Sequence, residues 1–345
     1  AARARSALRA GSAPGAGSAP GAGSALGARE YAGAMTDTPA ATASATPAPA
    51  SADAASRDGS APLPAPIVAL LDGTLVDVTT PIVRADDLGV VRGDGVFDVA
   101  HVRERVVDGL DAHLERLAAS ARILALPEPD EAGFRRAVDA LVDAWDWQRS
   151  PEGVVRLVMT RGAETGGTGP SAWAMLSPMS PAVIREREGV RVVVLDRGME
   201  AEGTVDLPWL LPGAKSLSYG INMAAKRWAV ANGADDALFV TPNGRLLEGP
   251  TSTLVVDLDG ALRTPAQDGI LKSTTLEALF AAAPGAGLDL EFADLRLDDL
   301  ERVRGAWLLS SGRVLAPITH LDGREVPRSP QHEVLARVLG VPGAA

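Results

Sequence analysis

The sequence predicts an α+β fold in two domains, a small α+β domain at residues 63–180 and a larger strand-rich domain at residues 190–345. Short apolar runs bounded by Asp-Gly and Asn-Gly turns predict strands, and longer segments with apolar residues at helical spacing predict helices between them. The charged segment 181–189 has little apolar periodicity, so we expect it to link the two domains. A chain of 345 residues is long enough to bury a substantial core.

Residues 1–62 differ in composition from the rest of the chain. They consist mainly of Ala, Gly, Ser, Pro and Thr, and they contain too few large apolar side chains to offset the entropy cost of ordering. Arg3, Arg5 and Arg9 are compatible with a targeting peptide, but no hydrophobic region follows them. We therefore expect a disordered, low-complexity tail.

Charge and residue usage exclude several classes of protein. A net charge of -11 argues against binding to nucleic acid or to an anionic membrane surface. The absence of cysteine excludes disulfides and thiolate metal sites, and the four histidines lack metal-ligand spacing, so no metal is expected. No apolar run approaches the length of a membrane span. We expect a soluble, cytoplasmic protein.

The small domain contains two predicted helices. Apolar residues between Leu110 and Leu124 form one helical stripe, and Arg116 lies at its edge, where its side chain can reach inward. A second helix begins at Asp130. Strands are expected at 67–71, 74–76, 96–102, 102–106, 154–160 and 172–176.

In the large domain, one amine and one carboxylate stand out. Apolar spacing predicts a helix over 216–232, which places Lys215 at the helix entry. Residues 237–248 predict a hairpin around an Asn-Gly turn, and period-two alternation puts Glu248 on the same face as Leu246. If that face is buried, the carboxylate needs a cation or strong donors.

Two further elements follow the hairpin. Residues 253–257 and 261–263 predict a second hairpin, again around an Asp-Gly turn. A Thr-x-x-Glu pattern at Thr274 predicts the start of an alanine-rich helix, whose free N–H groups can receive an anion.

An amine, an inward carboxylate and an anion cradle are together what pyridoxal phosphate (PLP) requires, for its aldehyde, its ring nitrogen and its phosphate. The order of motifs from about residue 66 to the C terminus resembles the fold-type IV PLP enzymes, which include branched-chain aminotransferases, D-amino-acid transaminases and aminodeoxychorismate lyases. The resemblance implies a small α+β domain and a larger α/β-barrel-like domain, with the cofactor in the cleft between them.

The resemblance also implies a role for particular residues. Lys215, in Ala-Lys-Ser-Leu-Ser-Tyr, matches the lysine that binds the aldehyde, and Glu248, in Leu-Leu-Glu-Gly-Pro-Thr, matches the glutamate at the ring nitrogen. Arg116, in a His-x-x-Arg-Leu motif, matches the arginine that binds the phosphate. The phosphate loop is altered to Lys-Ser-Thr-Thr at 272–275, in which backbone donors can remain. The other implied cofactor contacts are Leu271, Ser273, Thr274, Ser311 and Tyr219.

Some positions leave alternatives open. Asp98 ends a run that resembles the signature Gly-Asp-Gly-x-Phe-Glu, so aspartate stands where Glu or Thr is common. Tyr219 is either a contact for the phenolic oxygen of PLP or a core residue. Phe97, Arg161 and Trp209 are candidates for substrate binding, and Arg161 would bind a substrate carboxylate.

Within the family, the sequence favours a lyase that converts 4-amino-4-deoxychorismate to 4-aminobenzoate and pyruvate. The chain has no Arg-x-His motif after Thr160-Arg161-Gly162, the motif with which D-amino-acid transaminases bind the substrate carboxylate. It also has no Tyr-x-Arg-Pro stretch, which branched-chain enzymes have. One alternative is an aminotransferase with a 2-oxo-acid acceptor. The other is a catalytically silent member of the family, which the altered 272–275 loop and Asp98 suggest. The resemblance further implies a homodimer acting on a small-molecule substrate.

Overall fold

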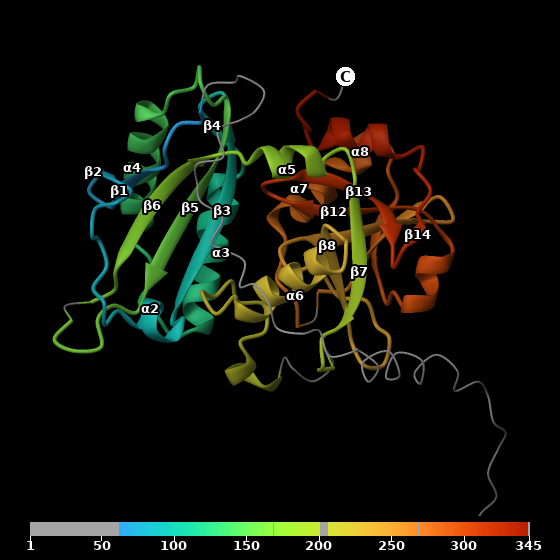
Figure 1. Cartoon of the computed structure of the whole chain (residues 1–345), viewed down its shortest axis with the longest axis horizontal. Coiled ribbons are helices and arrows are strands. Elements are labelled where there is room, and N and C mark those ends of the chain that lie inside the picture. The colour runs from blue at the N-terminus through green and yellow to red at the C-terminus, as the bar shows by residue number, and fades with distance from the viewer. Residues whose placement is uncertain (1–61, 168, 201–205, 268, 344–345) are drawn as a thin grey trace, which may run out of the picture. The chain divides into compact units, whose positions relative to one another are not determined.

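The computed structural model describes residues 62–343 except 168, 201–205 and 268, and it contains two β-sheets with helices packed on them (Figure 1). The first sheet is formed by the blue to green part of the chain in Figure 1, and the second by the yellow-green to red part. The expected tail at 1–62 lies outside the described residues, apart from Pro62.

The first sheet has six antiparallel strands, which are Ile67–Leu70 (β1), Leu75–Asp77 (β2), Gly95–Arg103 (β3), Val106–Val107 (β4), Glu152–Thr160 (β5) and Ala172–Pro178 (β6). Their order is β2-β1-β6-β5-β3-β4, and β3 pairs with β5 over its whole length, from Gly95 opposite Thr160 to Arg103 opposite Glu152. Five of the six predicted strands of this region are confirmed. The strand expected at 102–106 is wrong, because β3 continues to Arg103, the chain turns at 104–105, and β4 begins only at Val106.

Helices Leu110–Ile123 (α3) and Glu131–Ala144 (α4) pack their apolar sides on one face of this sheet. Leu117 and Phe134 on the helices and Leu157 on β5 are fully buried in this core. Asp130 caps α4 by accepting a hydrogen bond from the backbone of Gly133, as its side chain favours at a helix start. Both helix predictions are confirmed, and the other face of the sheet remains available for a site.

Two shorter helices lie outside the predicted set. Leu88–Arg92 (α2) precedes β3 and is capped by Asp87. Pro181–Glu186 (α5) occupies most of the segment predicted as the linker. Ser180 caps α5 and Pro181 takes its first position, where the missing N–H of proline has no cost, so a local helix signal was present in the sequence.

The second sheet is mixed, with strands Val190–Asp196 (β7), Asp236–Val240 (β8), Thr253–Leu258 (β9), Ala261–Pro265 (β10), Leu290–Ala293 (β11), Val303–Ser310 (β12), Val314–Leu321 (β13) and Arg324–Glu325 (β14). The order is β11-β10-β9-β12-β13-β7-β8, with β14 beside β13. The hairpin of β9 and β10 is confirmed, and Leu246 pairs with Val240 as predicted for the hairpin that leads to Glu248.

Helices Gly220–Ala231 (α6), Thr274–Ala282 (α7) and His332–Val338 (α8) pack on this sheet, and short 3-10 turns lie at Pro208–Leu210, Pro284–Ala286 and Leu297–Glu301. The predicted start of α7 at Thr274 is confirmed, but its capping residue and the predicted start of α6 are wrong. The cap of α7 is Ser273 rather than Thr274, since its hydroxyl accepts from the backbone of Leu276. Helix α6 begins four residues later than predicted, because the preceding residues pair with β3 instead.

Candidate active site

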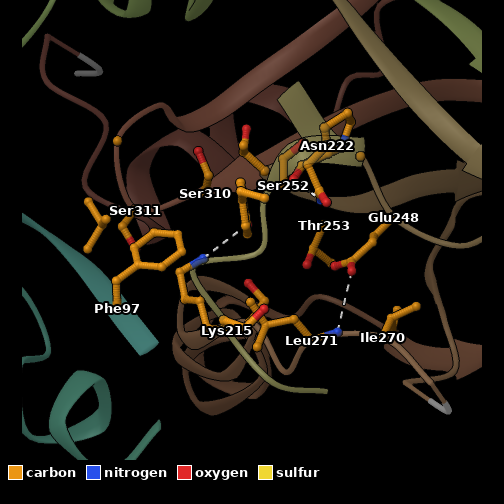
Figure 2. A pocket seen from close by; sticks show the side chains of 18 of the residues that line it. Phe97, Lys215, Asn222, Glu248, Ser252, Thr253, Ile270, Leu271, Ser310 and Ser311 are labelled. Atoms are coloured by element: carbon orange, nitrogen blue, oxygen red, sulfur yellow. Dashed lines mark hydrogen bonds between the residues drawn. The ribbon is translucent and has the colours of Figure 1, made fainter. Parts of the chain in front are cut away.

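A cavity of about 950 Å³ is lined by residues from both sheets and from the segments that connect them. From the first sheet, Phe97 and Val99 of β3 and Val154 and Arg156 of β5 face the cavity, which is the face opposite the α3 and α4 core. The volume is in the range of cofactor and substrate sites in enzymes. Figure 2 shows ten of the lining residues by name.

Lys215 reaches this cavity because its backbone is bound to the first sheet. The amide of Phe97 donates to the carbonyl of Lys215 (3.1 Å), and the amide of Leu217 donates to that of Gly95 (2.8 Å). A side chain at Gly95 would come within 2.7 Å of Leu217 and of a β5 carbonyl, so this close approach requires glycine. The amide of Lys215 also donates to the hydroxyl of Ser120 on α3 (3.1 Å).

The amine of Lys215 is in an environment that favours its neutral form. Burial, and after it the positive charge of Arg116, lowers the pKa of Lys215 to about 8, although Asp98 and Glu248 act in the opposite direction. The Nζ atom lies 3.4 Å from the hydroxyl of Tyr219 and 4.8 Å from the ring centre of Phe97. A lysine in this state can act as a nucleophile or a base near neutral pH.

Glu248 points into the same cavity (Figure 2), but it shares this face with Leu247 rather than with Leu246, which is buried in the core of the second sheet. The predicted alternation is broken because the backbone of Phe239 bonds to both Leu247 and Glu248. Its carboxylate accepts one long hydrogen bond, 3.4 Å from the backbone amide of Leu271. Burial raises the pKa of Glu248 to about 7, against the effects of the Leu271 amide and of the charges on Lys215, Arg197 and Arg116. The group is therefore a buried acid that would gain from a cationic N–H partner.

Arg116 lines the cavity from α3 and is fixed there by Asp98. The guanidinium donates from Nε and Nη2 to the two oxygens of Asp98 (2.8 and 2.7 Å) and from Nη1 to the carbonyl of Lys272 (2.9 Å). His113 lies 2.7 Å from the same carboxylate. Burial alone would raise the pKa of Asp98, but the bonds from Arg116 and His113 outweigh it and hold the pKa well below its usual range. Aspartate at 98 thus forms a buried salt bridge with Arg116.

The expected anion cradle lies at the same cavity. Ser273, Thr274 and Thr275 line it at the start of α7, where unpaired backbone N–H groups favour a negative charge. Leu271 lines it just before this helix, and Ser311 lines it from the turn between β12 and β13.

Two of the predicted aromatic residues also meet at the cavity. The rings of Phe97 and Tyr219 contact each other edge to face, with their centres 5.1 Å apart at 81°. Burial raises the pKa of Tyr219 to about 12, so its hydroxyl keeps its proton and can donate a hydrogen bond.

Arg161 and Trp209 are not brought to the cavity. The guanidinium of Arg161 is bound to Asp94 (2.6 Å) and to the carbonyls of Leu124 (2.7 Å) and Ala125 (3.1 Å), so it serves as a structural tie. Trp209 is 72% exposed in the 3-10 turn at Pro208–Leu210 and does not line the cavity. A substrate role for either residue has no support from this geometry.

Three residues at the site were missed by reasoning from the sequence. Arg156 lines the cavity, and its guanidinium has no hydrogen-bond or ion-pair partner among the described residues. Its place could have been found, since Val155 and Leu157 mark the core face and Arg156 must face the other way. Ser120, which fixes Lys215, lies at the edge of the same predicted helix as Arg116, and Ser252 lies in the motif around Glu248, but neither was assigned a role from the sequence.

The residues of the cavity fit PLP. The hydroxyl of Ser252 is buried and has no partner within the described part of the chain, and the carboxylate of Glu248 has only one long bond. Such groups are costly unless a ligand completes them. Lys215 offers the amine, and Arg116 with the start of α7 offers the anion site. In the described residues no cluster of His, Asp or Glu could hold a metal ion, and no helix there is long and apolar enough to cross a membrane.

The buried acid at 248 predicts a pH dependence of the apoprotein. Its pKa is near 4.5 unfolded and about 7 folded, so the free energy of unfolding should fall by about 3 kcal/mol as pH rises from 4.5 to 7. The variant Glu248→Gln has no such proton to lose. Urea unfolding of both apoproteins across this range should show the variant gaining stability relative to the wild type. Parallel curves would mean that Glu248 titrates normally.

Comparisons with known proteins agree with this site. The family model for amino-transferase class IV matches residues 95–321. A relative from Mycobacterium tuberculosis (strain ATCC 25618 / H37Rv), named bifunctional aminodeoxychorismate lyase / D-amino acid transaminase, is 43% identical over 282 residues, which cover 79% of this chain and 97% of the relative.

Two solved structures are similar in fold and sequence. A hypothetical aminotransferase from Mycobacterium tuberculosis in its PLP-bound form has a TM-score of 0.76 at 43% identity, covering 80% of this chain and 97% of that one. The fold IV-transaminase CpuTA1 from Curtobacterium pusillum has a TM-score of 0.75 at 41% identity, with coverage of 80% and 97%. The chain therefore belongs to the class IV aminotransferase family, and its cofactor is PLP.

Proposed function

We propose that this protein is a PLP-dependent lyase that converts 4-amino-4-deoxychorismate to 4-aminobenzoate and pyruvate. The observation that carries the proposal is the buried amine of Lys215 in one cavity with the buried carboxyl of Glu248. Transamination of a D-amino acid at the same site is the second candidate, because the relative at 43% identity is named for both activities.

Bound PLP supplies an aldehyde that captures the substrate amine and a ring that withdraws electrons from it. Glu248 holds a proton at the ring nitrogen, which strengthens that withdrawal. Lys215, whose pKa is lowered to about 8, is partly neutral near pH 7, so its Nζ can accept the proton from the substrate ring carbon. Arg116 and the start of α7 bind the phosphate and fix the substrate relative to Nζ.

The two candidate reactions use the same base in different ways. In the lyase reaction the ring carbon loses its proton to Lys215, the C–O bond to the enolpyruvyl group breaks, and the departing enolate takes up a proton to become pyruvate. In transamination Lys215 would carry the proton from one carbon to another. The shape and charge of the cavity, rather than Lys215 and Glu248, must therefore select the reaction.

Arg156 supports an anionic substrate. Aminodeoxychorismate has two carboxylates and an amino acid has at least one, and an unpaired guanidinium in a partly dry cavity binds such groups well. Burial lowers the pKa of Arg156, which is the effect expected of a cation without a nearby anion. We assign to Arg156 the role that the sequence had suggested for Arg161.

Incubation of the purified enzyme with aminodeoxychorismate should release pyruvate and 4-aminobenzoate in equal amounts. Arg156→Ala should lower kcat/KM by about 10- to 100-fold, because a charge-assisted hydrogen bond to the substrate is lost, while PLP binding is kept. Arg161→Ala is the matched control, because Arg161 does not line the cavity. Its kcat/KM, measured per amount of folded enzyme, should stay at the wild-type value. If no pyruvate is released but the amino group is transferred from D-alanine to 2-oxoglutarate, the result would favour the transaminase. If neither activity is found, it would favour a catalytically silent member.

Borohydride reduction of the holoenzyme should attach PLP to Lys215 alone. The sequence contains two other lysines, Lys226 and Lys272, which serve as internal controls. Lys226 also lines the cavity, but its amine lies 3.5 Å from the buried carboxylate of Asp236 and forms an ion pair with it. Mass spectrometry of the reduced protein locates the label, and a label on Lys226 or Lys272 would refute the role of Lys215.

We also propose a homodimer. Support comes from large apolar side chains that are exposed on α2 and α6, with Val90, Ile221 and Val230 each more than half exposed. Light scattering should give twice the mass of the chain, and Ile221→Glu should shift the protein towards the monomer. A monomeric wild type at micromolar concentration would contradict this proposal.

A further inference from the structure

A buried chain of alternating charges runs from the first sheet to the rim of the cavity. His101 on β3, Glu152 on β5 and Arg187 after α5 have side chains that are 3%, 13% and 7% exposed. None of the three lines the cavity. Their arrangement therefore has no direct part in holding PLP or substrate.

His101 is held between two carboxylates. Its Nδ1 lies 2.8 Å from Asp108, and its Nε2 lies 3.1 Å from Glu152. Only the doubly protonated imidazolium can donate to both acceptors, so the geometry is that of a cation. The four side chains, counting Asp108 and Arg187, then sum to zero charge.

Arg187 carries this chain to the turn between β12 and β13. It donates from Nη1 and Nη2 to the two oxygens of Glu152 (3.1 and 2.8 Å). The same guanidinium donates to the carbonyl of Gly312 from Nη2 (3.1 Å) and to that of Arg313 from Nε (3.0 Å). Four N–H groups of one side chain are thus used to join β5 to this turn.

The turn itself forms part of the cavity wall. Ser310, Ser311 and Gly312 all line the cavity, and Ser311 is the residue expected to contact the phosphate. The side chain of Arg313 fixes the other end of the turn through Glu186 and Asp236. Without Arg187, the carbonyls of Gly312 and Arg313 would lose buried donors, and the serines would lose a fixed position.

We propose that His101, Glu152 and Arg187 form a strut that positions the Ser310–Gly312 turn for PLP binding, so that breaking the strut weakens cofactor retention without touching the cofactor. These are positioning residues, acting through backbone carbonyls. The inference rests on the PLP site and is independent of which reaction the enzyme performs.

The strut should make part of the PLP affinity dependent on pH. Burial lowers the pKa of His101, but the bonds to Asp108 and Glu152 outweigh it and raise the pKa above its usual value. The groups that face Glu152 are His101 and Arg187, and they overcome burial to lower its pKa to about 2. The strut is therefore complete at neutral pH, and it loses one donor as pH rises through the raised pKa of His101.

The test is the dissociation constant of PLP, measured by absorbance on titrating each apoprotein. Glu152→Gln should raise this constant about tenfold, the size of effect seen when an outer hydrogen-bond partner of a binding group is removed. Arg187→Lys keeps the positive charge but loses the paired hydrogen bonds of the guanidinium, so it should also weaken PLP binding. The dissociation constant of His101→Gln should exceed that of the wild type most at acidic pH, and this difference should shrink as pH rises through the raised pKa of His101.

His332→Gln is the matched control. His332 is a buried histidine on α8 that accepts a hydrogen bond from Trp307 (3.0 Å), and it does not line the cavity. Its loss should lower thermal stability and leave PLP affinity and its pH profile unchanged. Wild-type PLP affinity in Glu152→Gln and Arg187→Lys would overturn the proposal, as would an equal loss in His332→Gln. If Glu152→Gln fails to fold, Arg187→Lys decides alone.

Discussion

The pairing of residues 215–217 with the first residues of β3 is the constraint on which the site depends. Two backbone hydrogen bonds, between Phe97 and Lys215 and between Leu217 and Gly95, bind the segment before α6 to the first sheet. Lys215 therefore does not lie at the mouth of a helix with a solvated side chain. It enters the cavity from a short segment that is bound to β3 and to Ser120 on α3, and its position follows from backbone geometry rather than from its own side-chain contacts.

Burial then determines the chemistry of the groups that this pairing brings together. Both Lys215 and Glu248 are shifted towards their neutral forms, to pKa values of about 8 and 7, because the cavity disfavours either charge. Asp98 is shifted in the opposite direction, since Arg116 and His113 bind its charged form directly. The site thus separates an ion pair that fixes Arg116 at the cavity from an acid and an amine whose pKa values lie near neutrality.

Whether an arginine near the site has an acidic partner explains why four of these arginines have different roles. Arg116 is bound to Asp98, Arg161 to Asp94 and Arg187 to Glu152, and each of these holds a backbone carbonyl in place. Arg156 faces the cavity with no hydrogen-bond or ion-pair partner in the described part of the chain. A cation that the fold leaves without an anion is the one best suited to meet an anionic substrate.

The sequence by itself determined most of the elements and the order of the site residues. Helical spacing predicted α3 and α4, and the motifs around Lys215, Glu248 and residues 272–275 indicated the cofactor, because these signals are local. Period-two alternation wrongly grouped Glu248 with Leu246, because the chain is irregular at Leu247 and Glu248. Only the tertiary structure decided where α6 begins and that Arg161 binds Asp94 instead of facing the cavity. Both depend on partners distant in sequence, β3 for the segment before α6 and Asp94 for Arg161, and no local pattern encodes such contacts.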